Sequence, residues 1–138
     1  MPFVQWDESM NLGKASIDQQ HRGLFDLVNI LYEAMGSKAE AEVVEDCVDA
    51  MSRYCLEHFR DEENYMALIG FPDLPTHKEL HQAFMQQTSV LVDALDQGQS
   101  PFQEALFALV RWLDEHIRQE DVRYIQFARD NGLAAEPD

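Results

Sequence analysis

Apolar side chains recur every three or four residues along most of the chain, and this spacing predicts amphipathic helices. The first predicted helix covers about residues 18–35, where Asp18 can cap the start and Gly36 closes the end. The second covers about residues 39–69, because the apolar spacing persists until Gly70. Each segment therefore has one face to bury against other helices.

Two further helices follow the same pattern. The third begins after the proline-containing break at residues 72–75 and stops at Gly98. The fourth opens at Ser100, the predicted N-cap, with Pro101 at the first helical position, and it ends near residue 131.

Four amphipathic helices with short connections and no alternating strand pattern predict an all-α fold, an antiparallel up-down-up-down four-helix bundle. The bundle covers about residues 18–131. Residues 1–17 are expected to form an N-terminal arm, with Phe3, Val4 and Trp6 available to pack on the bundle. A chain of 138 residues is long enough for one core, so residues 1–138 are expected to form a single domain.

Polar residues interrupt these apolar faces at related positions. All five histidines of the chain fall on predicted interior positions: His21, His58, His77, His81 and His116. Glu62 falls on an interior position too. Any one of the histidines could be a hydrogen-bonded core residue. Burying several imidazoles and a carboxylate without partners is costly, however, and the antiparallel order brings them towards one end of the bundle. A bound cation would explain the whole set, whereas a metal-free bundle with hydrogen-bonded core histidines is the alternative.

The donor types narrow the choice of metal. Nitrogen-rich sites with carboxylates and no thiolate suit iron, manganese, cobalt or zinc. Five histidines plus acids overfill one zinc ion, so two metals bridged by carboxylates fit better. A ferritin-like site is disfavoured because no histidine has a glutamate three residues before it.

Charge and cysteine content exclude other classes of function. Ten Lys and Arg face 26 Asp and Glu, and the formal charge of −16 disfavours nucleic acid and anionic membrane surfaces as partners. The chain has no membrane-spanning run and its start does not resemble a signal peptide, so a cytoplasmic location is expected. Cys47 and Cys55 lie eight residues apart on one predicted helix, roughly 12 Å, which is too far for a disulfide.

The combined spacing resembles the hemerythrin family, specifically the bacterial hemerythrins, from Trp6 to about Phe127. Four short motifs carry the resemblance, one on each predicted helix. They are D-x-x-H (Asp18 and His21), H-x-x-x-E (His58 and Glu62), H-x-x-x-H (His77 and His81) and H-x-x-x-x-D (His116 and Asp121).

The resemblance implies a non-haem di-iron centre with an oxo or hydroxo bridge. One iron would be held by His77, His81 and His116, the other by His21 and His58, and both would be bridged by Glu62 and Asp121. The iron with fewer histidines would keep one position open, where O₂ binds reversibly. We therefore expect a binding protein for oxygen storage, transport or delivery, and not an enzyme. The alternatives are an oxygen or redox sensor acting on a separate partner, which is disfavoured because no output domain follows the bundle, and a di-iron enzyme acting on peroxide, nitric oxide or ferrous iron.

Some assignments near the site depend on the resemblance alone. Regular helical periodicity places Glu120 closer in angle to His116 than Asp121, and only the family pattern favours Asp121. Asp61 and Glu63 are expected to be solvated surface residues. The candidate walls of the site are side chains on or beside the ligand turns: Phe25, Phe59, Trp112 and Leu113.

Overall fold

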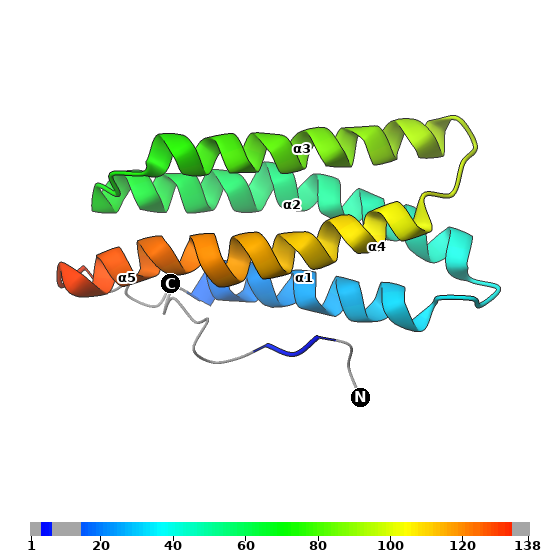
Figure 1. The fold of residues 1–138 in the computed structure, drawn as a ribbon, viewed down its shortest axis with the longest axis horizontal. Helices are drawn as coiled ribbons and strands as arrows, with labels where there is room; N and C mark the ends of the chain where they lie inside the picture. The colour runs from blue at the N-terminus through cyan, green and yellow to red at the C-terminus, as the bar shows by residue number, and fades with distance from the viewer. Residues whose placement is uncertain (1–3, 7–14, 134–138) are drawn as a thin grey trace.

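The computed structural model describes residues 4–6 and 15–133. Helices make up most of this part of the chain (Figure 1). In order they are α1 (Ala15–Glu33), α2 (Glu40–Ile69), α3 (Leu74–Asp96), α4 (Phe102–Arg111), η2 (Trp112–Glu120) and α5 (Asp121–Asp130). The last three form one continuous rod, in which η2 is a π-helix with wider turns.

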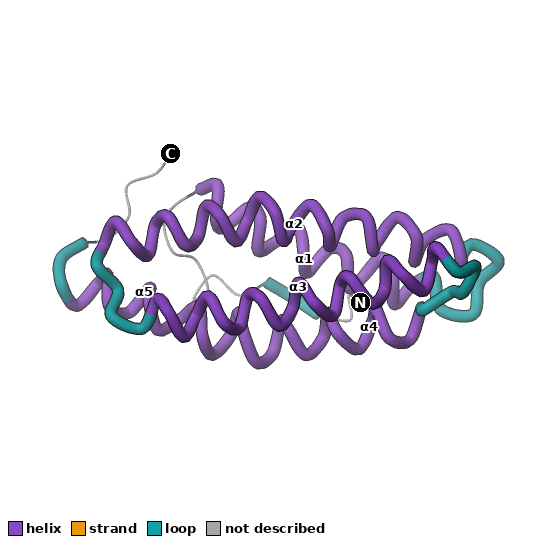
Figure 2. The backbone as a smooth tube through the Cα atoms, turned by 90° about the horizontal axis from the view of Figure 1, so that it is seen from above, coloured by secondary structure: helices purple, strands orange, loops and turns teal. Residues whose placement is uncertain are grey.

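The rods run antiparallel to one another in sequence order. The connections alternate between the two ends of the bundle, which both views show (Figures 1 and 2). Helix α2 packs against α1 and α3, and α4 closes the bundle against α1. The predicted all-α antiparallel bundle is confirmed, and residues 4–6 and 15–133 contain no strand.

Gly70 ends α2 as the sequence predicts. Its φ of 72° lies in the left-handed region, which a residue with a Cβ adopts at a cost. The backbone N–H groups of Gly70 and Phe71 donate to the carbonyls of Ala67 and Met66, so two carbonyls at the helix end are satisfied. The chain can then turn sharply into α3, which keeps the end of α2 beside the start of α3.

Two predicted helix starts are wrong. Helix α1 begins at Ala15, so Asp18 lies in its first turn and is not the N-cap. The additional residues include Ile17, which is fully buried, and this burial favours extending the helix. At the fourth helix, Pro101 occupies the N-cap position in place of Ser100, because its ψ of 56° is not helical and its carbonyl accepts the first helical hydrogen bond, from Ala105.

Two apolar cores fill the bundle at different heights. The larger core draws on all four rods and includes Val28, Met51, Phe84 and Leu109. The smaller core lies near the α2–α3 connection and consists of Ile17, Tyr65, Met66, Phe71, Tyr124 and Ile125. The predicted polar site residues lie where the two cores adjoin along each rod; only His58 and His116 are followed by one more residue of the larger core.

Part of the predicted arm packs on the bundle. Val4 exchanges two hydrogen bonds of 2.9 Å with the side chain of Asn29 on α1. The Trp6 ring meets Phe25 edge-on, with ring centroids 5.3 Å apart. Phe3 and residues 7–14 lie outside the described residues.

The structure also bears on the cysteines and on membrane-spanning segments. Cys47 and Cys55 are buried and not joined in a disulfide, and burial raises the pKa of Cys47 to about 12. Over the described ranges, no helix combines the length and the apolar character needed to cross a membrane.

Candidate metal centre

Seven polar side chains meet between the two cores, and none is more than 3% exposed. They are the seven predicted site residues: His21 on α1, His58 and Glu62 on α2, His77 and His81 on α3, His116 on η2 and Asp121 at the start of α5. The antiparallel order brings them together, because the start of one rod lies beside the end of the next.

Glu62 lies at the centre of the cluster and divides its oxygens between two groups of histidines. Its Oε2 is 3.1 Å from Nε2 of His21 and 3.2 Å from Nε2 of His58. Its Oε1 is 3.3 Å from Nε2 of His77 and 2.9 Å from Nε2 of His81. One carboxylate therefore faces both halves of the site.

Asp121 divides its oxygens in the same way. Its Oδ1 is 2.9 Å from Nε2 of His77 and 3.0 Å from Nε2 of His116, whereas its Oδ2 is 3.2 Å from Nε2 of His21. The two carboxylates thus form a double link between the two halves.

The donors form two overlapping sets whose ligand atoms lie within 4.8 Å of one another. The three-histidine set contains His77, His81 and His116, and the two-histidine set contains His21 and His58; each set also includes Glu62 and Asp121. The arrangement offers places for two ions that share two carboxylates.

Unsatisfied polar atoms show that these donors suit a metal. Nε2 of His77, Nε2 of His116 and both carboxylate oxygens of Asp121 are buried without a hydrogen-bond partner among the described residues, although they lie close to one another. Such atoms are normally satisfied in native proteins, because leaving them unpaired is costly. Polar atoms that converge without hydrogen-bonding to each other fit bound cations, and five imidazoles with two carboxylates are donors that iron accepts.

The π-helix η2 explains why Asp121 lies in the cluster five residues after His116. The backbone N–H of Asp121 donates to the carbonyl of His116, so one turn here takes an extra residue. Residues five apart then share a face, as residues four apart do in an α-helix. Glu120 lies instead at the surface, where it pairs with Arg123. Periodicity pointed to Glu120 only because it assumes α-helical turns throughout.

The expectation that Asp61 and Glu63 are simply solvated is wrong. Glu63 Oε2 accepts a hydrogen bond of 2.7 Å from Nδ1 of His81. Asp61 Oδ2 accepts a hydrogen bond of 3.0 Å from Gln20, whose Oε1 in turn lies 2.6 Å from Nδ1 of His58. Both acids are half-buried because they lie beside an adjacent helix. Glu63 hydrogen-bonds to a site histidine directly, and Asp61 is linked to one through Gln20.

Two tyrosines near the site were also missed. The Tyr124 hydroxyl donates to Glu62 Oε2 at 2.6 Å, and burial together with the Glu62 charge raises the Tyr124 pKa well above its usual value. Tyr54 stacks on His58, with centroids 4.5 Å apart. Tyr124 falls three residues after Asp121 on the buried face of α5, and this spacing was the available signal.

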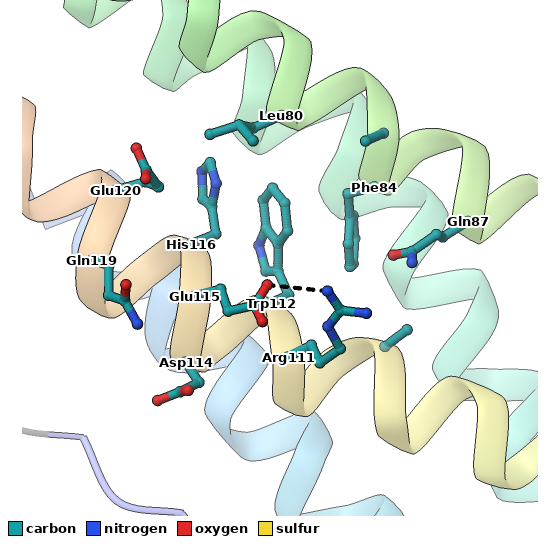
Figure 3. Close-up of a pocket in the computed structure, with 12 residues that line it drawn as sticks. Leu80, Phe84, Gln87, Arg111, Trp112, Asp114, Glu115, His116, Gln119 and Glu120 are labelled. Atoms are coloured by element: carbon teal, nitrogen blue, oxygen red, sulfur yellow. Dashed lines mark hydrogen bonds and ion pairs between the residues drawn. The ribbon is translucent and has the colours of Figure 1, made fainter.

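Aromatic rings hold several histidine rings in place. Phe59 stacks on His81 at 3.9 Å, and Trp112 stacks on His116 at 3.8 Å. Phe25 and Leu113, the other candidate wall residues, belong to the larger core. Figure 3 shows Trp112 beside His116 in a groove of about 590 Å³ between α3 and the fourth rod.

Without metal, the site balances its own charges. Burial lowers the pKa of His21 and of His77, but the carboxylates of Asp121 and Glu62 outweigh burial and raise these pKa values to about 10 and about 9. Burial opposes ionisation of Glu62 and Asp121 too, yet the surrounding histidines hold both carboxyl pKa values below their usual range. Protons thus occupy positions where cations would provide the same compensation.

Comparison with known proteins agrees with this chemistry. The family model described as "Hemerythrin HHE cation binding domain" matches residues 13–128. The chain is similar to a bacteriohemerythrin of Pseudomonas paraeruginosa, with 33% identity over 132 residues that cover 94% of this chain and 84% of the relative. A bacteriohemerythrin of Clostridium acetobutylicum is 34% identical over 125 residues, covering 87% and 97% of the two chains. A hemerythrin-like protein of Naegleria gruberi is 32% identical over 124 residues, covering 89% and 91%. This chain belongs to the hemerythrin family, whose members bind O₂ at a di-iron centre.

Proposed function

We propose that the protein binds O₂ reversibly, for oxygen storage, transport or delivery, and that it is not an enzyme. The observation that carries the proposal is the inequality of the two donor sets. They share the oxygens of Glu62 and Asp121, but one set has three histidines and the other has two. We assign O₂ to the two-histidine side, because that side has one protein donor fewer.

The assignment of residues follows from the two sets. His77, His81 and His116 would hold one iron, His21 and His58 would hold the other, and Glu62 and Asp121 would bridge them. When bound, the iron pair supplies the exchange of electrons with O₂, which amino-acid side chains do not provide.

The protein's own contribution is to orient the donors and exclude water. The stacked rings of Phe59 and Trp112 fix the planes of His81 and His116. The almost complete burial of all seven side chains keeps solvent from the reacting centre and so limits side reactions.

Tyr124 favours binding over catalysis. Its hydroxyl donates a hydrogen bond of 2.6 Å to Glu62, but the residue is fully buried and its pKa is raised well above the usual value. A donor that holds its proton and lies away from water is poorly suited to repeated protonation of a substrate. The sensor alternative, in which the protein acts on a separate partner, and the cytoplasmic location both remain predictions from the sequence.

An optical experiment tests the proposal. The purified protein is loaded anaerobically with ferrous iron, and air is then admitted and removed over several cycles. We expect a visible oxygen-to-iron charge-transfer band that appears and disappears with O₂, with zinc-loaded protein as a control that shows no band. Irreversible bleaching, or multiple turnovers of peroxide or nitric oxide, would contradict reversible carriage and favour an enzyme.

A further inference from the structure

Two histidines of the site are hydrogen-bonded, through the ring nitrogen that points away from the centre, to side chains that differ in charge. Nδ1 of His81 lies 2.7 Å from Oε2 of Glu63, and Nδ1 of His58 lies 2.6 Å from Oε1 of Gln20. An ionised carboxylate and an amide oxygen only accept hydrogen bonds. Each Nδ1 therefore carries a hydrogen, and Nε2, which faces Glu62, is the ring nitrogen left to bind a metal ion.

These supports make the two halves of the site unequal. In the three-histidine set, a carboxylate contacts the His81 ring directly. In the two-histidine set, the neutral amide of Gln20 stands between the His58 ring and the carboxylate of Asp61, to which it donates at 3.0 Å. Nδ1 of His21 and Nδ1 of His116 have no hydrogen-bond partner among the described residues.

Glu63 is placed to act through His81. It follows Glu62 on α2 and reaches across to α3, and its side chain is 26% exposed. A carboxylate that accepts the outer N–H of a ligating imidazole fixes the ring and makes the inner nitrogen more basic. A more basic nitrogen stabilises the more highly charged metal ion.

We propose that Glu63 is a positioning residue that fixes His81 for metal binding and, through its negative charge, lowers the reduction potential of the iron on the three-histidine side. This inference rests on the ligand assignment given under the proposed function. The charge makes the two irons electronically different, since the corresponding support of His58 is neutral.

Three variants separate the charge of Glu63 from its hydrogen bond. Glu63→Gln keeps an acceptor oxygen but removes the charge, and Glu63→Ala removes both. Glu79→Gln is the matched control, because Glu79 is an exposed glutamate on α3 between the two site histidines of that helix, so the same charge is removed at the surface. Two quantities are measured for each variant: the affinity of the metal-free protein for Co(II), and the midpoint potential of the iron-loaded protein in equilibrium with redox mediators.

We expect Glu63→Gln to retain its Co(II) affinity. Its midpoint potential should rise, so that the equilibrium between oxidised and reduced iron shifts towards the reduced form by about tenfold or more, the lower end of the effects of residues that hydrogen-bond to metal ligands. Glu63→Ala should weaken Co(II) binding roughly 10–100-fold. Glu79→Gln should match the wild type in both measurements.

Either of two results overturns the inference. One is a Glu63→Gln potential equal to that of Glu79→Gln, which would show that the charge has no effect on the irons. The other is a Glu63→Ala protein with wild-type Co(II) affinity, which would show that His81 needs no support. Neither measurement uses O₂, so a protein that holds iron but fails to release O₂ would contradict the proposed function and leave this test intact.

Discussion

Asp121 and Glu120 are adjacent acids with opposite surroundings. Asp121 is fully buried among three histidines, whereas the Glu120 side chain is 33% exposed beside Arg123. Loss of a residue that hydrogen-bonds to a metal ligand typically lowers metal affinity roughly 10–100-fold. We predict that Asp121→Ala lowers iron affinity by more than this, because both donor sets lose an oxygen. Glu120→Ala should leave the iron content unchanged. Metal analysis of the two purified variants distinguishes them, and loss of iron from Glu120→Ala alone would reverse the assignment.

The residues that face the centre could be predicted from the sequence, but the residues that support them could not. The five histidines and Glu62 repeat at helical spacing on apolar faces, so burial without a partner made them conspicuous, whereas Asp121 was identified only through the family pattern. Glu63 and Asp61 lie beside Glu62 on the helix, at angles that periodicity assigns to solvent. Only the positions of the neighbouring helices decide that these acids meet His81 and Gln20, and such packing is not encoded in local spacing.

Among the elements, η2 departs furthest from the sequence-based expectation. Together with α4 and α5, η2 corresponds to the single predicted fourth helix. Nothing in local residue preferences indicates its wider turns. An irregularity of this kind becomes visible only when a residue five positions away must share a face. The family pattern contained that information in the spacing from His116 to Asp121.

The wide turns lead to a prediction about deletions. Removing Gln119, an exposed residue of η2, should convert the segment to ordinary α-helix and place His116 and Asp121 four residues apart, still on one face. Helix α5 keeps its phase, so we expect both irons to be retained. Removing exposed Gln86 from regular α3 should instead rotate Thr88 and Leu91 away from the core and cost about 3 kcal/mol or more of unfolding free energy.

Chemical denaturation and iron analysis of the two deletion variants test this difference. A Gln119 deletion as unstable as the Gln86 deletion would show that η2 is not an insertion of one residue into an α-helix. Retained stability with loss of iron would show instead that the wide turns themselves orient the donors.

At the scale of the whole molecule, stability should depend on pH differently with and without metal. In the metal-free protein the pKa values of His21 and His77 are raised to about 10 and about 9, above the ordinary 6.5. Their protonation therefore stabilises the fold fully below about pH 6.5 and less as pH rises through 9 to 10. We predict that the free energy of unfolding of the metal-free protein falls by several kcal/mol between pH 7 and 10.

The iron-loaded protein is the control for this prediction. Its histidines hold metal in place of protons, so this decline should be absent, whereas contributions from the buried cysteines are common to both forms. The lowered pKa of His58 acts only below the ordinary histidine range and does not affect the comparison. Parallel unfolding curves for the two forms across this pH range would contradict the prediction.

The divided oxygens of Glu62 and Asp121 also affect how the protein acquires its metals. An ion in the three-histidine set would draw Oε1 of Glu62 and Oδ1 of Asp121 towards itself and so immobilise the opposite oxygens that face His21. The second ion would then meet donors that are already ordered, and its entropic penalty would be smaller. Uptake should therefore be cooperative, with singly loaded molecules scarce at every stage of a titration, and a chelator should remove the ions in pairs.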